Sequence, residues 1–221
     1  MSNFVFELEE AVAPYNLLNH PFYRAWNEGK LNNEMIKDYA KQYYHHVKAF
    51  PRYISATHSI CENIEDRKIL LENLNDEENN GVDHPTLWRR FAQGMGNSTE
   101  EIENAPLEAP IQNVIEKFFK YSRASYAEGL AALYTYEHQV PEIAQTKMKG
   151  LKEFYAPGNK QVLEFFQVHE KADIWHREQC QKLLNRMVKE DQAKAKYAAI
   201  EVAKALWGFL TGVAEKHGVI C

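Results

Sequence analysis

Apolar residues recur at steps of three and four along almost the entire chain, and this period constrains the fold more than any other feature of the sequence. The alternation of apolar and polar residues that is typical of strands is nearly absent, and glycines and prolines stand mainly at segment boundaries. The pattern therefore predicts an all-α fold of about seven or eight helices. With 221 residues, of which 45% are hydrophobic, one core is sufficient, so we expect residues 1–221 to form a single domain.

Prolines and glycines help to locate the predicted helices. Pro21 and Gly29 bracket a short helix, because proline favours the first turn and glycine follows the last. A longer helix runs from about Asn33 toward Cys61 and is expected to kink at Pro51. The remaining helices are expected at about residues 65–80, 84–96, 111–122, 124–154, 159–188 and 190–216, and the helix of 124–154 is expected to be interrupted by Pro141.

Charge and hydropathy argue against two classes of partner. The net charge is −5 at pH 7, and no basic stripe is present that could neutralise phosphates, so nucleic acid is not expected as a partner. No run reaches about 18 apolar residues, and the acidic start differs from a signal peptide, so no membrane partner is expected either. Cys61, Cys180 and Cys221 lack metal-type spacing and suit a reducing compartment. We therefore expect a cytoplasmic protein.

Three of the predicted helices carry ionisable residues in the middle of an apolar stripe. In the helix of residues 159–188 the stripe runs through the segment HEKADIWH, and the helices of 65–80 and 124–154 each place a carboxylate at an otherwise apolar position. A histidine follows the first of these two helices, beyond a bend expected at Gly81 and Pro85. The inward-facing residues are Glu77, His84, Glu137, His169, Asp173 and His176.

This set of residue types predicts a dinuclear metal centre inside a helical bundle. An unpaired buried charge is costly, so these groups must satisfy one another or bind a cation. Three carboxylates nearly balance two divalent cations bridged by a hydroxide, and mixed carboxylate and imidazole ligation suits iron or manganese rather than structural zinc. The alternative is a buried network of histidines and carboxylates that binds no metal. A relationship to ferritin is disfavoured, because the sequence has no Glu-x-x-His pair.

Four segments carry a resemblance to a known family: DYAKQYYHHVKAFPRYISATHS, LLENLNDEENNGVDH, AALYTYEHQVPEIAQTKMKGL and VHEKADIWH. They resemble the family of the Chlamydia protein associating with death domains, within the haem-oxygenase-like dimetal oxidases and related to pyrroloquinoline quinone biosynthesis protein C. The resemblance extends from about Tyr23 to Leu210. It implies a haem-oxygenase-like helical bundle that makes para-aminobenzoate for folate synthesis. The residues after Leu210 lack the cysteine-rich tail of the chlamydial member, so death-domain binding is not expected.

The resemblance also implies roles for particular residues. The metal ligands of the family match the same six residues that the apolar stripes select. The family resemblance implies an enzyme that consumes its own side chains, with Tyr23 as the source of the aromatic ring and Lys147 as the source of the amino group. Tyr39 matches a radical relay. The implied cofactors are two transition-metal ions, as Fe/Fe or Mn/Fe, together with dioxygen and an external reductant.

Two other classes of function remain open from the sequence. One is a metal-free enzyme of the same fold, acting in cofactor biosynthesis or thiamin degradation, although three histidines on apolar faces argue against it. The other is a helical interaction protein whose buried charges are only structural. Metal content separates both from a dimetal oxygenase. The sequence does not fix the oligomeric state, and a homodimer is the expectation for this fold.

Overall fold

The computed structural model describes residues 4–79 and 81–219, with residues 171–173 described by their backbone alone. All regular structure in this part of the chain is helical, and no described helix combines enough length with enough apolar residues to span a bilayer. Short 3₁₀ segments and one π-helical turn join the α-helices. The α-helices are α1 (Phe4–Val12), α2 (Pro21–Asn27), α3 (Asn33–Ser59), α4 (Ile64–Glu78), α5 (His84–Gly94), α6 (Thr99–Glu103), α7 (Ala109–Ala124), α8 (Tyr126–Glu137), α9 (Val140–Gly150), α10 (Glu164–Asn185) and α11 (Lys189–Lys216).

The all-α class predicted from the sequence is confirmed, and the chain is divided into more helices than the apolar period alone indicates. Helices α1 and α6 are short, and each adds a segment that the longer periodic runs do not reveal. The interruption predicted at Pro141 within 124–154 is confirmed: α8 ends at Glu137 and α9 begins at Val140. Pro141 lies in the first turn of α9, where a missing backbone N–H is tolerated.

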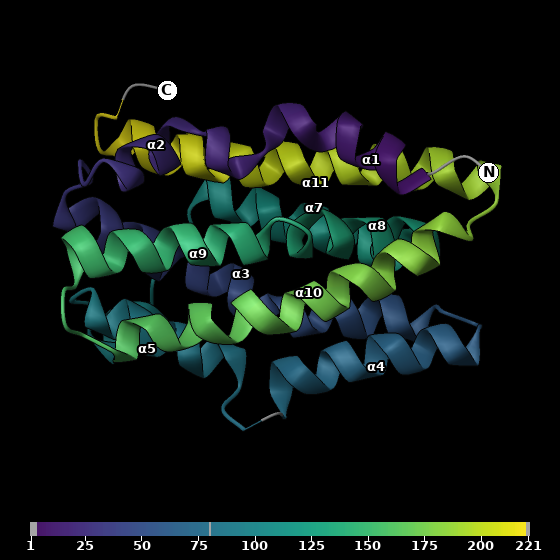
Figure 1. Cartoon of the computed structure of the whole chain (residues 1–221), viewed down its shortest axis with the longest axis horizontal. Helices are drawn as coiled ribbons and strands as arrows, with labels where there is room; N and C mark the ends of the chain where they lie inside the picture. The colour runs from purple at the N-terminus through teal and green to yellow at the C-terminus, as the bar shows by residue number, and fades with distance from the viewer. Residues whose placement is uncertain (1–3, 80, 220–221) are drawn as a thin grey trace.

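Helix α10 crosses the molecule diagonally and contacts every helix that carries a predicted metal ligand. It packs against α4, α5, α8 and α9, and Figure 1 shows it between α9 above and α4 below. Behind it, α3, α7, α8 and α11 contact one another and form the centre of the bundle. The first and last helices, α1 and α11, run side by side along one edge (Figure 1). The residues of HEKADIWH therefore face the middle of the bundle from one long helix.

Side-chain caps fix where the ligand-bearing helices begin. The side chain of Asn63 accepts backbone N–H groups in the first turn of α4. Asp83 accepts the backbone N–H of Thr86, so that His84 is the first residue of α5. Ser125 caps α8 in the same way. The bend that the sequence predicts between α4 and α5 is confirmed, and it turns the chain so that His84 is buried.

Gly129 allows α8 to approach α3 and α7 closely. A Cβ atom at this position would lie 2.5 Å from Oγ1 of Thr57 and 3.2 Å from the backbone Cα of Ser122. Gly208 on α11 is a useful contrast, because a Cβ atom there would meet no other atom within 4 Å. The two glycines therefore separate the effect of helix packing from the effect of helix propensity.

We predict opposite effects of alanine at these two helical positions. Gly129→Ala should lower the free energy of unfolding by about 1–3 kcal/mol, because the added methyl group forces α8 away from its neighbours. Gly208→Ala should raise it by roughly 0.5–1 kcal/mol, since alanine favours a helix and has open space. Urea unfolding followed by circular dichroism measures both. Stabilisation of the protein by both substitutions would show that α8 does not pack as the structure describes.

Candidate metal centre

Four helices deliver predicted ligands to one buried region. Glu77 lies in the last turn of α4, His84 begins α5, and Glu137 is the last residue of α8. His169 and His176 lie two turns apart on α10. Each of these five residues exposes 4% or less of its surface. Ionisable groups are rarely buried to this extent unless they are paired or bind a metal.

Three of the predicted ligands converge on one point. Glu77, His84 and His169 each offer one ligand atom, and these atoms lie within 4.8 Å of one another. Nδ1 of His84 is 2.9 Å from Oε2 of Glu77, and the imidazole centroids of His84 and His169 are 4.3 Å apart. A carboxylate and two imidazoles form a donor set that fits divalent iron or manganese.

The remaining described ligands, Glu137 and His176, have close protein partners. Oε1 of Glu137 accepts a hydrogen bond of 2.6 Å from Nδ2 of Asn73, and Oε2 lies 3.8 Å from the Sγ atom of Cys180. Nε2 of His176 lies 3.0 Å from Oδ2 of Asp76. A carboxylate that contacts a histidine in this way often orients the imidazole of a metal site. These two residues would have to share or exchange partners to bind an ion.

Asp173, the sixth predicted ligand, lies on α10 between His169 and His176, at helical steps of four and three residues. Its backbone is helical, and its side chain lies outside the described part of the structure. The role of Asp173 therefore stays a prediction.

Glu77 is ionised in this buried environment. Burial alone would raise the pKa of its carboxyl group. The charge and hydrogen bond of His84, together with the charges of His169 and His176, outweigh burial and hold the pKa below its ordinary value of 4.5. The region thus presents a carboxylate whose charge must be balanced by imidazolium groups or by a bound cation.

A backbone contact defines which nitrogen of His169 faces the site. Nδ1 of His169 lies 2.7 Å from the carbonyl oxygen of Phe165, one turn earlier on α10. A carbonyl oxygen only accepts, so Nδ1 donates its proton, and Nε2 holds the lone pair when the ring is neutral. The ring of His169 also stacks on the ring of Phe165, with centroids 4.0 Å apart. These contacts fix the tautomer and orientation that a metal ligand requires.

Lys147, on α9, places its amino group inside a cage of aromatic rings. The residue exposes 1% of its surface, and its Nζ atom has no hydrogen-bond partner among the described residues. Aromatic faces favour the ammonium form, but burial outweighs them and lowers the pKa of Lys147 well below its ordinary value of 10.5. The neutral amine is therefore favoured. Rings with centroids 4.0–5.8 Å from Nζ belong to Tyr39, Trp26, Tyr23, Phe22 and Phe166.

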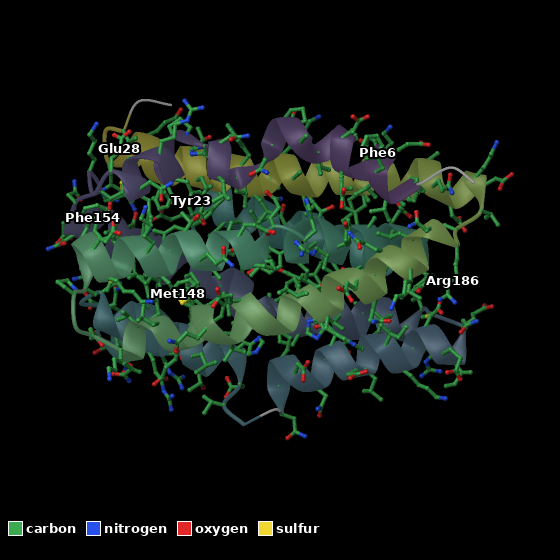
Figure 2. All side chains as sticks on the ribbon, in the orientation of Figure 1. Phe6, Tyr23, Glu28, Met148, Phe154 and Arg186 are labelled. Atoms are coloured by element: carbon green, nitrogen blue, oxygen red, sulfur yellow. The ribbon has the colours of Figure 1, made fainter. Side chains whose placement is uncertain are left out.

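Tyr23 and Tyr39 meet beside this amino group. Their phenols are close enough to influence each other's pKa, and burial raises the pKa of both well above 10.0. Both phenols therefore remain protonated at neutral pH. Tyr23 belongs to the short helix α2, which packs against α9, and its label marks this place in Figure 2. The structure thus brings together the three residues that the resemblance assigns to catalysis.

A small cavity lies beside these residues, and one of its lining rings also contacts the ligand-bearing region. Its volume is about 30 Å³, and its lining includes Tyr23, Tyr39, Lys147 and Phe165. One water-sized molecule needs roughly 10–15 Å³, so the cavity has room for about two such molecules. Phe165 lines the cavity and also stacks on His169, so one aromatic ring connects the cavity to the converging ligands.

Sequence reasoning missed several residues of this region. Asn73 lies four residues before Glu77 and shares its face of α4, so the helical period could have identified it. Tyr43 stands four residues after Tyr39 and lines the same cavity, so the helical period could have identified it too. Asp76 gave no signal, because it lies beside the apolar stripe and its side chain is 25% exposed.

Comparison with known proteins decides the family. Residues 37–208 match the family described as iron-containing redox enzyme, of the haem-oxygenase-like type. The chain belongs to this family. The match spans α3 to α11 and includes every candidate metal ligand.

Curated relatives extend this result to nearly the whole chain. A protein of Chlamydia trachomatis named 4-aminobenzoate synthase is 41% identical over 94% of this chain and 90% of its own length. A protein of Nitrosomonas europaea with the same name is 36% identical over 97% of this chain and 93% of its own length. A pyrroloquinoline-quinone synthase of Ectopseudomonas mendocina is 24% identical over 67% and 62%. The predicted family resemblance is confirmed.

Solved structures agree on the fold. A TenA homologue from Pseudomonas syringae superposes with a TM-score of 0.83 at 16% identity, covering 96% of this chain and 93% of that one. A protein from Shewanella denitrificans, described as having a haem-oxygenase-like fold, reaches 0.82 at 17% identity, covering 97% and 94%. The predicted haem-oxygenase-like fold is confirmed, and at such identities the likeness concerns the fold alone.

We predict that the purified chain binds about two iron or manganese ions and that His169→Ala loses at least one of them, because it removes a nitrogen from the converging set. Elemental analysis after supplementation with iron and manganese measures the content. His217→Ala is the matched control, since His217 ends α11 and contacts Asp38 instead. Unchanged metal content in a Glu137→Ala/Asp173→Ala double variant would contradict the ligand assignment.

Lys147→Met should stabilise the chain at neutral pH. The folded chain binds a proton at Lys147 less tightly than the unfolded chain does, because the pKa is lower in the folded state, and protonation therefore favours unfolding. Removing the amine should therefore raise the melting temperature by about 2–4 °C per kcal/mol gained. The gain should shrink as the pH approaches 10.5, where the unfolded lysine also loses its proton. Thermal melts across this range provide the measurement.

The control for this prediction is Lys149→Met, on the exposed side of the same helix. It should change the melting temperature little at any of these pH values. A Lys147→Met chain that is less stable than the original at pH 7 would show that the buried amine contributes to folding instead of opposing it.

Proposed function

We propose that this chain makes 4-aminobenzoate for folate synthesis by an oxygen-dependent reaction at a non-haem dimetal centre, with Tyr23 supplying the ring and Lys147 the nitrogen. The observation that carries the proposal is the close packing of the Lys147 amino group against the ring of Tyr23. Nζ of Lys147 lies 5.2 Å from the ring centroid of Tyr23, and both residues are buried. The relatives named 4-aminobenzoate synthase support the identity of the product.

The metal centre proposed for this reaction consists of two iron ions, or one iron and one manganese ion. When bound, such ions supply the capacity to activate dioxygen with electrons from an external reductant. The chain contributes a buried, charged ligand set next to an apolar wall, which keeps bulk water away from the reacting groups. The residues proposed to bind the ions are Glu77, His84, Glu137, His169, Asp173 and His176.

The size of the cavity supports an aromatic source within the chain. A cavity of about 150 Å³ is needed to admit benzene. The cavity beside Lys147 measures about 30 Å³, which suits dioxygen but not a free aromatic substrate. The ring of Tyr23 is part of the chain and needs no entry path. The packing thus favours consumption of a resident side chain over turnover of a diffusing precursor.

Tyr39 is proposed as the relay between the metal centre and Tyr23. Its phenol is close enough to that of Tyr23 to influence its pKa, both rings contact Phe22, and the centroid of its ring lies 4.0 Å from Nζ of Lys147. An oxidised Tyr39 that lacks its phenolic hydrogen atom can take the hydrogen atom of the Tyr23 hydroxyl. Tyr39 is then restored, and the radical lies on the ring that is to be released from the chain.

We further propose that residues 1–221 act as one domain in the cytoplasm and that two copies form a homodimer. The continuous contacts from α1 to α11 support one domain. Light scattering on the purified chain would test the dimer.

We predict that each chain acts about once. Because the ring comes from Tyr23, the amount of product should not exceed the amount of protein supplied with reduced metals, oxygen and reductant. Tyr23→Phe should abolish product and leave metal content unchanged, because it removes a phenol and no ligand. Tyr197→Phe is the control, since Tyr197 is 58% exposed. Product is measured by chromatography, and intact-chain mass spectrometry reports changes at residues 23 and 147.

Isotope labelling provides an independent test of the same prediction. Cells grown with ring-labelled tyrosine should produce labelled 4-aminobenzoate. Many turnovers from an added aromatic precursor, with Tyr23 intact afterwards, would refute consumption of the chain and leave an ordinary dimetal oxygenase.

A further inference from the structure

Asn73 is a buried polar residue that neither the apolar stripes nor the family resemblance assigns to the site. It lies on α4, one turn before Glu77, so both side chains point from the same face of the helix. Only 3% of its surface is exposed. Its Nδ2 atom donates a hydrogen bond of 2.6 Å to Oε1 of Glu137, at the end of α8. The bond therefore connects two of the three helices that carry carboxylates of the candidate metal centre.

The other end of the Asn73 amide is not satisfied. Its Oδ1 atom is buried and has no hydrogen-bond partner among the described residues. A buried acceptor without a partner costs about 1–3 kcal/mol, whereas a leucine of similar size would have no such cost. Packing alone thus does not account for an asparagine here, and the bond to Glu137 is its distinctive contribution.

We infer that Asn73 is a positioning residue, which holds the carboxylate of Glu137 in the orientation needed to bind a metal ion. This inference rests on the proposed function to the extent that Glu137 is a metal ligand. A glutamate at the end of a helix has several rotatable bonds, and fixing them before an ion arrives reduces the cost of binding. A short bond to a charged acceptor is strong enough to do so.

The contacts of Glu137 show how the carboxylate could bind an ion and keep this bond. Asn73 holds Oε1 at 2.6 Å, while the contact of Oε2 with Sγ of Cys180 is long, at 3.8 Å. A thiol is a weak donor, so this contact does not hold Oε2 strongly. The hydrogen bond from the side-chain amide of Asn73 to Oε1 is retained, because a carboxylate oxygen has two lone pairs. Asn73 therefore acts through Glu137 and need not touch the ion.

The test compares two substitutions of the same kind on the same helix. Asn73→Leu removes the donor to Glu137, and Asn75→Leu changes an asparagine on the exposed side of α4. The full-length, metal-free chain is titrated with Mn²⁺ alone, and binding is followed by calorimetry and by the paramagnetic resonance of free Mn²⁺. Asn73→Leu should raise the dissociation constant of at least one ion by about 10–100-fold. Asn75→Leu should bind Mn²⁺ as the original chain does.

Circular dichroism of each metal-free variant controls for folding. If Asn73→Leu loses helicity, Asn73→Ala provides the same test with a smaller side chain and is expected to weaken Mn²⁺ binding in the same way. Asn73 variants that are less stable without metal, yet bind Mn²⁺ with unchanged constants, would show a purely structural role and overturn the inference. An original chain that binds no Mn²⁺ or Fe²⁺ at all would overturn the proposed function together with it.

Discussion

The contact between Glu77 and His84 is the constraint on which the arrangement of the bundle depends. A carboxylate and an imidazole 2.9 Å apart, almost without exposure to solvent, must remain together, because separating them would leave a charge unpaired in the core. The two residues belong to consecutive helices, so the chain must turn sharply between α4 and α5. Helix α10 then covers the pair and supplies His169 as the third member of the cluster.

The same bundle contains a second buried polar group, the amino group of Lys147, whose surroundings are aromatic instead of acidic. The amino group of Lys147 makes no ion pair with any carboxylate in the described part of the chain, and aromatic rings surround it on several sides. One region thus holds acidic and imidazole groups suited to cations, and the other holds a neutral amine beside two phenols. Separation keeps the amine from forming an ion pair with the carboxylates, which would make it unreactive.

The sequence predicted the features that follow from periodicity. Residues such as His169 and Glu137 interrupt an apolar stripe, and a stripe shows which side of a helix is buried, so their inward position could be predicted. The break between α8 and α9 could be placed only approximately, because Pro141 is tolerated in a first turn. The hydrogen bond of Asn73 to Glu137 could not be predicted, since it depends on how two helices distant in sequence are packed. Periodicity identifies which face of each helix is buried. Which of these faces contact one another is known only from the folded structure.

The ring of Phe165 lines the cavity and stacks on His169 of the ligand cluster. Its chemistry treats protons and electrons differently. A benzyl side chain has no hydrogen-bond donor or acceptor, so protons have no path through it, whereas an electron can pass between stacked rings. A proton released by a tyrosine of the cavity therefore finds no path through this ring toward the ligand cluster. Among the described side chains that line the cavity, Lys147 is the only amine. Lys147, the residue proposed to supply nitrogen, is thus also proposed as the base that accepts the proton of the oxidised phenol. The electron and the proton would leave that phenol in different directions.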